Sequence, residues 1–293
     1  MKPAPFEYAR PGTLDEACAL LAADEGARII AGGQTLVPLM AMRLARPSRL
    51  IDIARIPGLA FIREERGAVV IGATTRQCVV EGDPLVRAKL PLLAKAMPFV
   101  GHAPTRARGT IGGSLANADP AAEIALVAVT LEATLSWRDG GKTADVAASD
   151  FFIGPMVTAL PQAGCLTVVR FPVWTEPRIG TGFHEVNPRK SDFAFVSAAA
   201  QIAVDGAGRC IRAAIGIGAA TAVPLGLDTV GKALEGTRAE DKLVREAVDA
   251  ALAGIEPMAD LHASADYRKR AARALAVRAI ADAYQDARGA DAR

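Results

Sequence analysis

Two glycine-centred segments contain the residues best suited to chemistry. The first, residues 31–36, reads Ala-Gly-Gly-Gln-Thr-Leu and lies between a predicted strand and a predicted helix. Glycine lacks a Cβ atom, so the backbone N–H groups of such a segment can approach a ligand closely. Successive N–H groups at a helix start attract anions, and the side chains of Gln34 and Thr35 add donors. A Gly-Gly pair is also common in an ordinary tight turn, so both interpretations stand.

The second segment, residues 109–123, is longer and carries more functional groups. A Gly-Gly pair lies between the hydroxyls of Thr110 and Ser114, and two carboxylates follow at Asp119 and Glu123. Hydroxyls can donate to phosphate oxygens, and acidic side chains accept from ribose hydroxyls in nucleotide sites. Alternatively, Asp119 caps a helix whose first residue is the following proline. That alternative explains Asp119 but not the run Thr-Ile-Gly-Gly-Ser-Leu-Ala-Asn before it.

Other catalytic chemistry has little support in the sequence. The four cysteines are scattered with no CxxC pair, and there are three histidines, so we expect no metal site and no catalytic residue in this chain. The phosphate-binding pattern GxxxxGK[ST] is absent, and residues 216–221 end in threonine where a dinucleotide fingerprint needs glycine or alanine. The chemistry is therefore expected to come from a bound group.

Composition narrows the possible partners. The chain has 293 residues, 34 Lys+Arg against 32 Asp+Glu, and 51% hydrophobic residues. A nearly neutral balance gives no electrostatic surface for nucleic acid, and no apolar run is long enough for a membrane span. Residues 1–7 lack the basic-then-apolar pattern of a signal peptide, which predicts a cytoplasmic location.

The elements that must position these segments are mixed. A Thr13–Glu16 capping box predicts a helix, and mostly helical structure is expected over residues 74–99. The remaining predictions are strands at 6–9, 27–30, 49–53, 133–137, 165–171, 182–186, 194–204 and 210–216, a hairpin around 65–67, and helices at 36–44, 121–132 and 267–284.

These elements predict an α+β fold in two domains. Two prolines in the polar stretch 172–178 indicate a boundary. We expect residues 1–176 to form a two-part domain of mixed sheets and helices that carries both glycine-centred segments. Residues 177–293 should form a smaller α/β domain of sheet plus helices.

Three segments in this order carry a specific resemblance. They are residues 31–40, 106–123 and 183–194, and the second is the most specific. Together they resemble the FAD-binding medium subunit of molybdenum hydroxylases, the carbon monoxide dehydrogenase and xanthine dehydrogenase relatives. The resemblance covers nearly the whole chain.

The resemblance implies FAD as the cofactor and assigns two groups of residues to it. The first motif corresponds to the pyrophosphate loop of the family: Ile30, Ala31, Gly32, Gly33, Gln34, Thr35, Leu36 and Val37. The second corresponds to its other phosphate and flavin loop: Thr110, Gly112, Gly113, Ser114, Asn117 and Asp119, with Glu123 in an acidic position.

Four further positions follow from the same resemblance. Val100 stands where xanthine dehydrogenases carry an aromatic residue beside the flavin, and Leu166 matches a position near flavin or adenine. His184 falls where those enzymes have lysine, and Lys190 is a second cationic candidate. The departures at Val100 and His184 favour the three-subunit bacterial type. Judged without the family, His184 on a strand is at least as often a structural histidine.

The implied function is electron transfer within an oxidoreductase complex. A large partner subunit would hydroxylate the substrate at a molybdenum cofactor, and a small partner would pass the electrons through [2Fe-2S] clusters to FAD in this chain. NAD, oxygen or another acceptor would then receive them, and the complex could be a dimer of heterotrimers. One alternative is a stand-alone FAD-dependent oxidoreductase with a base from His102, His184 or Tyr284. Another is a non-enzymatic nucleotide-binding or scaffold protein.

Overall fold

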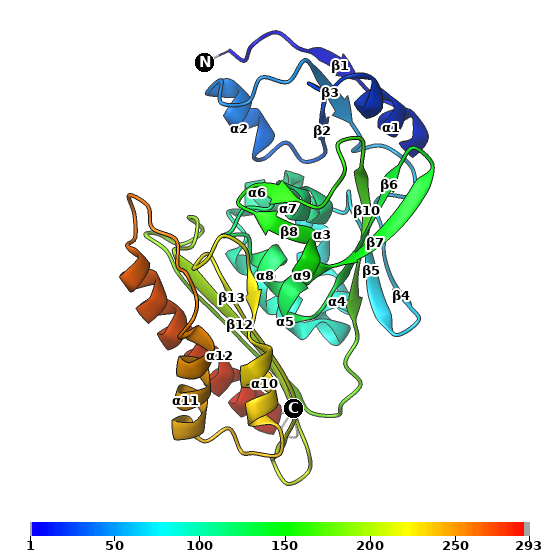
Figure 1. The fold of residues 1–293 in the computed structure, drawn as a ribbon. Coiled ribbons are helices and arrows are strands. Elements are labelled where there is room, and N and C mark those ends of the chain that lie inside the picture. Colours follow the sequence, from blue (N-terminus) through cyan, green and yellow to red (C-terminus); the bar gives the residue numbers. More distant parts are fainter. Residues whose placement is uncertain (1, 290–293) are drawn as a thin grey trace.

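The computed structural model describes residues 2–289 and has three principal sheets, arranged along an elongated molecule (Figure 1). The first sheet is parallel, in the order β1 (Glu7–Ala9), β3 (Arg49–Asp52), β2 (Arg28–Ile30). Helix α1 (Leu14–Ala23) packs beside it and starts with the predicted capping box, in which Thr13 Oγ1 accepts from Glu16 N at 3.2 Å. Helix α2 (Leu36–Ala41) follows the first glycine-centred segment.

The second sheet is antiparallel and has five strands in the order β4-β5-β10-β6-β7. Their bounds are Ile62–Glu65, Ala68–Gly72, Cys165–Pro172, Thr134–Asp139 and Lys142–Ala147. Short helices cover it: α3 (Gln77–Gly82), α4 (Pro84–Lys89), α5 (Pro91–Ala96), α6 (Ala103–Arg108), α7 (Ile111–Asn117), α8 (Glu123–Thr130) and α9 (Ala148–Phe151). A small hairpin of β8 (Phe152–Gly154) and β9 (Val157–Thr158) lies beside α7.

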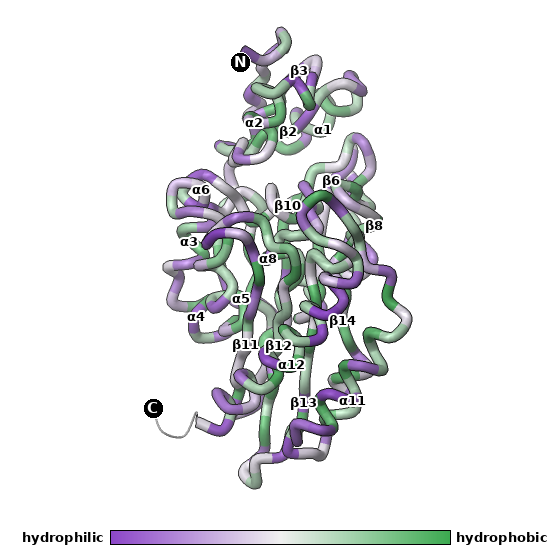
Figure 2. Tube along the Cα trace, turned by 90° about the vertical axis from the view of Figure 1, so that its left-hand side faces the viewer, coloured by the Kyte–Doolittle hydropathy of each residue, from purple (hydrophilic) through white to green (hydrophobic). Residues whose placement is uncertain are grey.

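The third sheet is antiparallel in the order β11 (Ile179–Val186), β12 (Val196–Val204), β13 (Cys210–Gly218), β14 (Leu225–Gly226). Helices α10 (Asp228–Leu234), α11 (Asp241–Leu252) and α12 (Ala265–Gly289) complete this part. All nine residues of β12 are buried. Along this strand Ala198 and Ala200 face the core under α12, whereas Ala199 faces the core of the second sheet. Figure 2 shows that the strands of the third sheet are largely hydrophobic where they pass through the middle of the molecule.

The predicted α+β class is confirmed, and several element predictions need correction. The mostly helical structure expected over residues 74–99 is confirmed, and it consists of short helices divided at Pro84, Pro91 and Pro98, because proline has no N–H for an interior helical bond. The helix expected at 36–44 ends at Ala41. The composition also predicts helix from Leu225 onward, but the first two residues of that segment form strand β14 before helices α10, α11 and α12 begin.

The second glycine-centred segment also differs from its prediction. Residues 111–117 form helix α7, capped by Thr110, whose Oγ1 accepts from Gly113 N at 3.0 Å. Asp119 does not cap α8, because its Oδ1 accepts from Ala121 N at 2.9 Å in the turn between the two helices. Helix α8 begins at Glu123, and its N-cap residue is Ala122.

Candidate functional site

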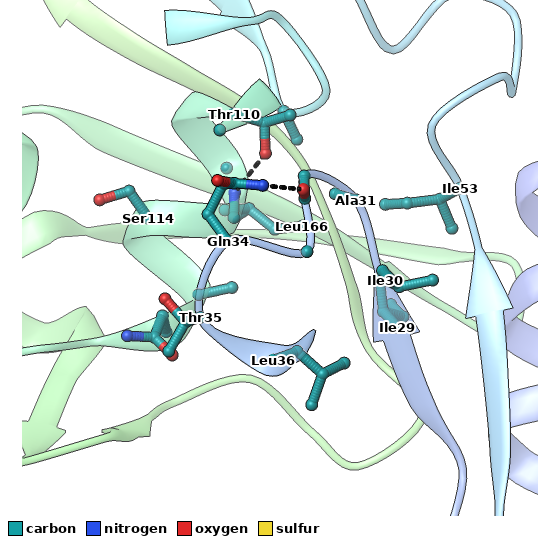
Figure 3. Close-up of a pocket in the computed structure, with 18 of the residues that line it drawn as sticks. Ile29, Ile30, Ala31, Gln34, Thr35, Leu36, Ile53, Thr110, Ser114 and Leu166 are labelled. Carbon is teal, nitrogen blue, oxygen red and sulfur yellow. Dashed lines mark hydrogen bonds between the residues drawn. The ribbon is translucent and has the colours of Figure 1, made fainter. Parts of the chain in front are cut away.

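A cleft with a volume of about 300 Å³ lies where the first sheet meets α7 and the start of β10. Its first wall is the end of β2 with residues 31–36, and its second wall is residues 109–117 (Figure 3). Residues 160–166, which lead into β10, close its remaining side. The two segments singled out in the sequence are thus brought face to face.

Most of the residues predicted to bind the cofactor line this cleft. They are Ile30, Ala31, Gly32, Gly33, Gln34, Thr35, Leu36, Thr110, Gly112, Gly113, Ser114, Asn117 and Leu166. The arrangement places glycines and hydroxyl or amide side chains on both walls, with Gln34 and Thr35 across from Thr110 and Ser114 (Figure 3). Such a polar, narrow region suits the close approach of backbone to phosphate.

Gly32 lets the two walls of the cleft meet main chain to main chain. A Cβ on Gly32 would lie 2.5 Å from the carbonyl oxygen of Arg108, so a larger residue there would push the two segments apart. A Cβ on Gly112 would lie 2.4 Å from Cβ of Ala73, which fixes the start of α7 against the end of β5. Gly33 has φ = +70°, a conformation that side-chain-bearing residues rarely adopt.

Free polar groups remain inside the cleft. Gln34 Nε2 donates to the carbonyl of Gly32 at 3.1 Å, which braces the loop from within. Among the described residues, the hydroxyls of Thr35 and Ser114 have no hydrogen-bond partner, and neither does the buried Oε1 of Gln77. These groups can form hydrogen bonds with a ligand without losing a hydrogen bond that stabilises the fold.

Apolar side chains complete the lining of the cleft. They are Ile29, Ile53, Leu160 and Leu166, which come from four separate elements or loops. A cleft that combines apolar side chains with glycine-rich polar segments matches a dinucleotide, whose base is planar and whose diphosphate is charged. The residues present therefore fit FAD.

The other predicted site residues lie outside this cleft. Val37 follows the loop and is 50% exposed, whereas Val100 is buried in the core of the second sheet. Lys190 lies in the exposed turn after β11. His184 Nε2 is 2.8 Å from Oδ2 of Asp282 on α12, which supports the structural interpretation of this histidine.

Asp119 and Glu123 flank the turn from α7 to α8, next to the end of the cleft. Glu123 is near a second carboxyl group, Glu185 on β11. Burial raises the pKa of Glu123 to about 7. Burial, followed by the charge of Glu123, raises the pKa of Glu185 to about 8, although a hydrogen bond from Asn187 acts in the opposite direction. The two groups therefore hold protons near neutral pH.

The sequence reasoning missed several residues that line the cleft. They are Arg28, Ile29, Ile53, Ala73, Gln77, Gly109, Ala116, Leu160, Gly164 and Cys165. Ile29, Gly109 and Ala116 adjoin the motifs and could have been included on that ground. Ile53 and Leu160 carry no motif, since only the sheet topology brings them to the cleft.

Comparison with known proteins assigns a family to this geometry. The family described as FAD binding domain in molybdopterin dehydrogenase matches residues 4–174, and the CO dehydrogenase flavoprotein C-terminal domain matches residues 181–283. The chain belongs to the family of FAD-binding medium subunits of molybdenum hydroxylases. Its cofactor is FAD, and it is an oxidoreductase subunit.

Relatives of this medium subunit match along nearly their whole length. The carbon monoxide dehydrogenase medium chain of Afipia carboxidovorans is 36% identical, with 96% of this chain and 97% of the relative covered. The nicotine 6-hydroxylase medium subunit of Paenarthrobacter nicotinovorans is 34% identical, covering 97% and 99%. In the solved structure of reconstituted CO dehydrogenase from Oligotropha carboxidovorans, a chain matches with a TM-score of 0.94 and 34% identity, covering 98% and 100%.

Two structural features are absent from the described residues of the medium subunit. Between residues 2 and 289, no cluster of three His, Cys, Asp or Glu side chains is arranged to hold a metal ion. Across the same residues, no helix combines the length and hydropathy needed to traverse a bilayer.

Proposed function

We propose that this chain carries FAD as the electron-transfer subunit of a three-subunit molybdenum hydroxylase. A large partner subunit holds the molybdenum cofactor, and a small partner passes electrons through [2Fe-2S] clusters to FAD here, which delivers them to an external acceptor. The supporting observation is the cleft between residues 31–36 and 109–117, seen together with relatives named medium chains and medium subunits. A dimer of such heterotrimers, the cytoplasmic location and the domain division at 176/177 remain predictions.

The residues of the cleft divide the binding of FAD between them. We assign the diphosphate to the glycine-rich walls, where the hydroxyls of Thr35 and Ser114 are available as donors. We assign the base to the apolar side chains of Ile53 and Leu166. Bound FAD supplies the redox chemistry, because it exchanges electrons both singly and in pairs. The protein's task is then to bind and orient it and to exclude water.

A stand-alone oxidoreductase is less well supported. Such an enzyme needs a base in its substrate site, and none of the three candidates lines the cleft. His102 is exposed, His184 is paired with Asp282, and the hydroxyl of Tyr284 donates to the carbonyl of Gly208 at 2.8 Å. The three residues also come from separate elements, so they do not form one catalytic group.

Replacing Ser114 by aspartate tests the binding site. The new carboxylate would stand in the polar part of the cleft and repel the diphosphate of FAD, while no fold hydrogen bond of Ser114 is lost. Ser149→Asp makes the same change at an exposed position outside the cleft. We expect FAD per purified chain, measured by absorbance after acid release, to fall at least ~10-fold in Ser114→Asp only, since ~1.4 kcal/mol is tenfold in affinity. Full FAD content in Ser114→Asp would refute the assignment.

The direction of electron flow needs a separate test. Reduced complex is mixed with an electron acceptor, and the oxidation of the iron–sulfur clusters is followed by rapid-freeze electron paramagnetic resonance. Complex that contains Ser114→Asp and lacks FAD should keep its clusters reduced much longer than the wild type. Equally fast oxidation without FAD would mean that electrons leave by another route, and the proposed role would be wrong.

A further inference from the structure

One outer stripe of α12 lines a groove on the surface. Tyr267, Arg270, Ala274 and Arg278 succeed one another at helical spacing and line a groove of about 450 Å³. The opposite side of the groove is the end of β11, which is an edge strand of its sheet. The alanine has a small side chain, so the groove is hollow between the two arginines.

The two arginines of this stripe have no ion-pair partner among residues 2–289. A neighbouring hollow of about 360 Å³ between α11 and α12 adds Arg245 and Arg273 to the same two arginines. Arg245 is paired with Asp241 and Arg273 with Asp249. In the part of the chain that the structure describes, no acidic group lies within ion-pair distance of Arg270 or Arg278.

The groups on β11 that face the stripe do not neutralise it. His184 is already paired with Asp282. Glu185 accepts from Asn187 Nδ2 at 2.6 Å, and burial raises its pKa to about 8, so its carboxyl group is largely protonated near neutral pH. The two arginines therefore present guanidinium groups that no described side chain engages in an ion pair, in a chain whose net charge is only +2.

Exposed apolar side chains lie at the N-terminal end of the stripe. Phe193 is 72% exposed, Leu261 is fully exposed and Tyr267 is 37% exposed. The ring of Phe195 lies 6.2 Å from His262 and 6.4 Å from Tyr267, which links the loop before β12 to the start of α12. Aromatic residues and arginine are the types enriched where protein interfaces bind most strongly.

We propose that Phe193, Leu261, Tyr267, Arg270 and Arg278, here named the α12 ridge, form the docking surface for the iron–sulfur partner subunit. The partner should present carboxylates opposite the arginines, because guanidinium groups bind carboxylates in a bidentate manner. This inference rests on the proposed function, which supplies the identity of the partner.

The position of the ridge selects the iron–sulfur subunit over the large one. Phe193 lines a hollow of about 380 Å³ together with Asp119, Pro120 and Ala121. Asp119 is two residues beyond Asn117, which lines the FAD cleft. A protein seated on the ridge is therefore beside the cofactor. The iron–sulfur subunit must come that close, because it delivers electrons to FAD directly.

The test compares two double variants of the full FAD-loaded chain. Arg270→Glu/Arg278→Glu reverses the charge of the ridge. Arg66→Glu/Lys142→Glu makes the same charge change at exposed turns of the second sheet, where neither residue has an ion-pair partner among those described. The dissociation constant for the purified iron–sulfur subunit is measured at low and high salt, together with FAD content and melting temperature.

We expect the ridge variant to bind the iron–sulfur subunit at least ~10-fold more weakly at low salt, with a reduced dependence on salt. The control variant should bind like the wild type, and all three chains should keep FAD. Unchanged binding of the iron–sulfur subunit by a ridge variant that holds FAD would overturn this inference and leave the proposed function standing. A wild-type chain that takes up no FAD, or binds no iron–sulfur subunit, would overturn the proposed function as well.

Discussion

At the scale of single residues, the pair of carboxyl groups at Glu123 and Glu185 has measurable consequences for stability. Both pKa values are raised mainly by burial, and Glu185 is raised further by the charge of Glu123. The folded chain thus binds protons at a pH at which the unfolded chain has released them. Stability falls with rising pH wherever the folded state holds more protons than the unfolded state. The loss therefore occurs as pH rises from 4.5, the ordinary pKa of a glutamate carboxyl, to about 8, the raised pKa of Glu185.

Glu185→Gln should remove part of this dependence. The amide does not ionise, so the melting temperature of the variant should fall less between about pH 6 and about pH 9 than that of the wild type. Calorimetry at the two pH values provides the measurement. Glu256→Gln, at an exposed carboxyl, should follow the wild type. A variant with the full wild-type decline would show that Glu185 ionises normally.

The residues of the cleft also show the limits of sequence reasoning at this scale. The glycine and hydroxyl positions of both motifs could be predicted to line a site, because they occur together in two segments that resemble the motifs of one family. Ile53 and Leu160 could not, since an isoleucine after a strand and a leucine in a loop are common everywhere. They reach the cleft only through the pairing of β2 with β3 and through the path of the chain into β10.

At the scale of elements, α12 lies unusually close to β11. A Cβ on Gly182 would be 2.0 Å from the carbonyl oxygen of Ala279, and one on Gly180 would be 2.1 Å from that of Ala283. The alanines of the helix and the glycines of the strand therefore fit without side chains between the two backbones. The contact positions α12, and with it the α12 ridge, relative to the sheet.

Gly182→Ala should displace the helix and destabilise the chain. Overpacking of this kind costs about 1–3 kcal/mol of unfolding free energy. In Gly206→Ala the added methyl group meets no atom within 4 Å, so that change should stay within ~1 kcal/mol of the wild type. Urea denaturation of both variants measures the difference. Equal stability of the two would contradict the close packing of α12.

Element prediction succeeded where a local signal existed. The Thr13–Glu16 capping box marked the start of α1, and the strands predicted at 194–204 and 210–216 correspond to β12 and β13. Strand β7 was missed because five of its six residues are exposed, so it lacks the alternation of hydrophobic and polar residues. Helix α7 was missed because glycines masked its buried stripe of Ile111 and Leu115.

At the scale of the whole molecule, the second and third sheets share a core. Phe183 on β11 packs against Phe99 with 4.9 Å between ring centroids, and it belongs to the same apolar cluster as the second sheet. Lys95 on α5 adds a hydrogen bond to the carbonyl of Thr181 at 2.5 Å. The second and third sheets therefore depend on each other, although the third sheet also has a core of its own under α12.

This dependence predicts a single unfolding transition for the FAD-loaded chain. Far-ultraviolet circular dichroism and the fluorescence of Trp137 and Trp174 should change together with urea concentration. Phe183→Ala removes a buried ring, which costs about 3–5 kcal/mol, and should separate the two curves because the shared core is weakened. Coincident curves in this variant would mean that other contacts hold the parts together.

The position of α12 in the chain also affects how the protein is made. Strand β12 ends at Val204, whereas the helix that covers it begins at Ala265. At about 5–20 residues per second, a ribosome needs roughly 3–12 s to synthesise the intervening chain. During that time a strand rich in alanine and valine emerges without its covering helix. The nascent chain should therefore be a substrate for chaperones at this stage, before any partner subunit can dock.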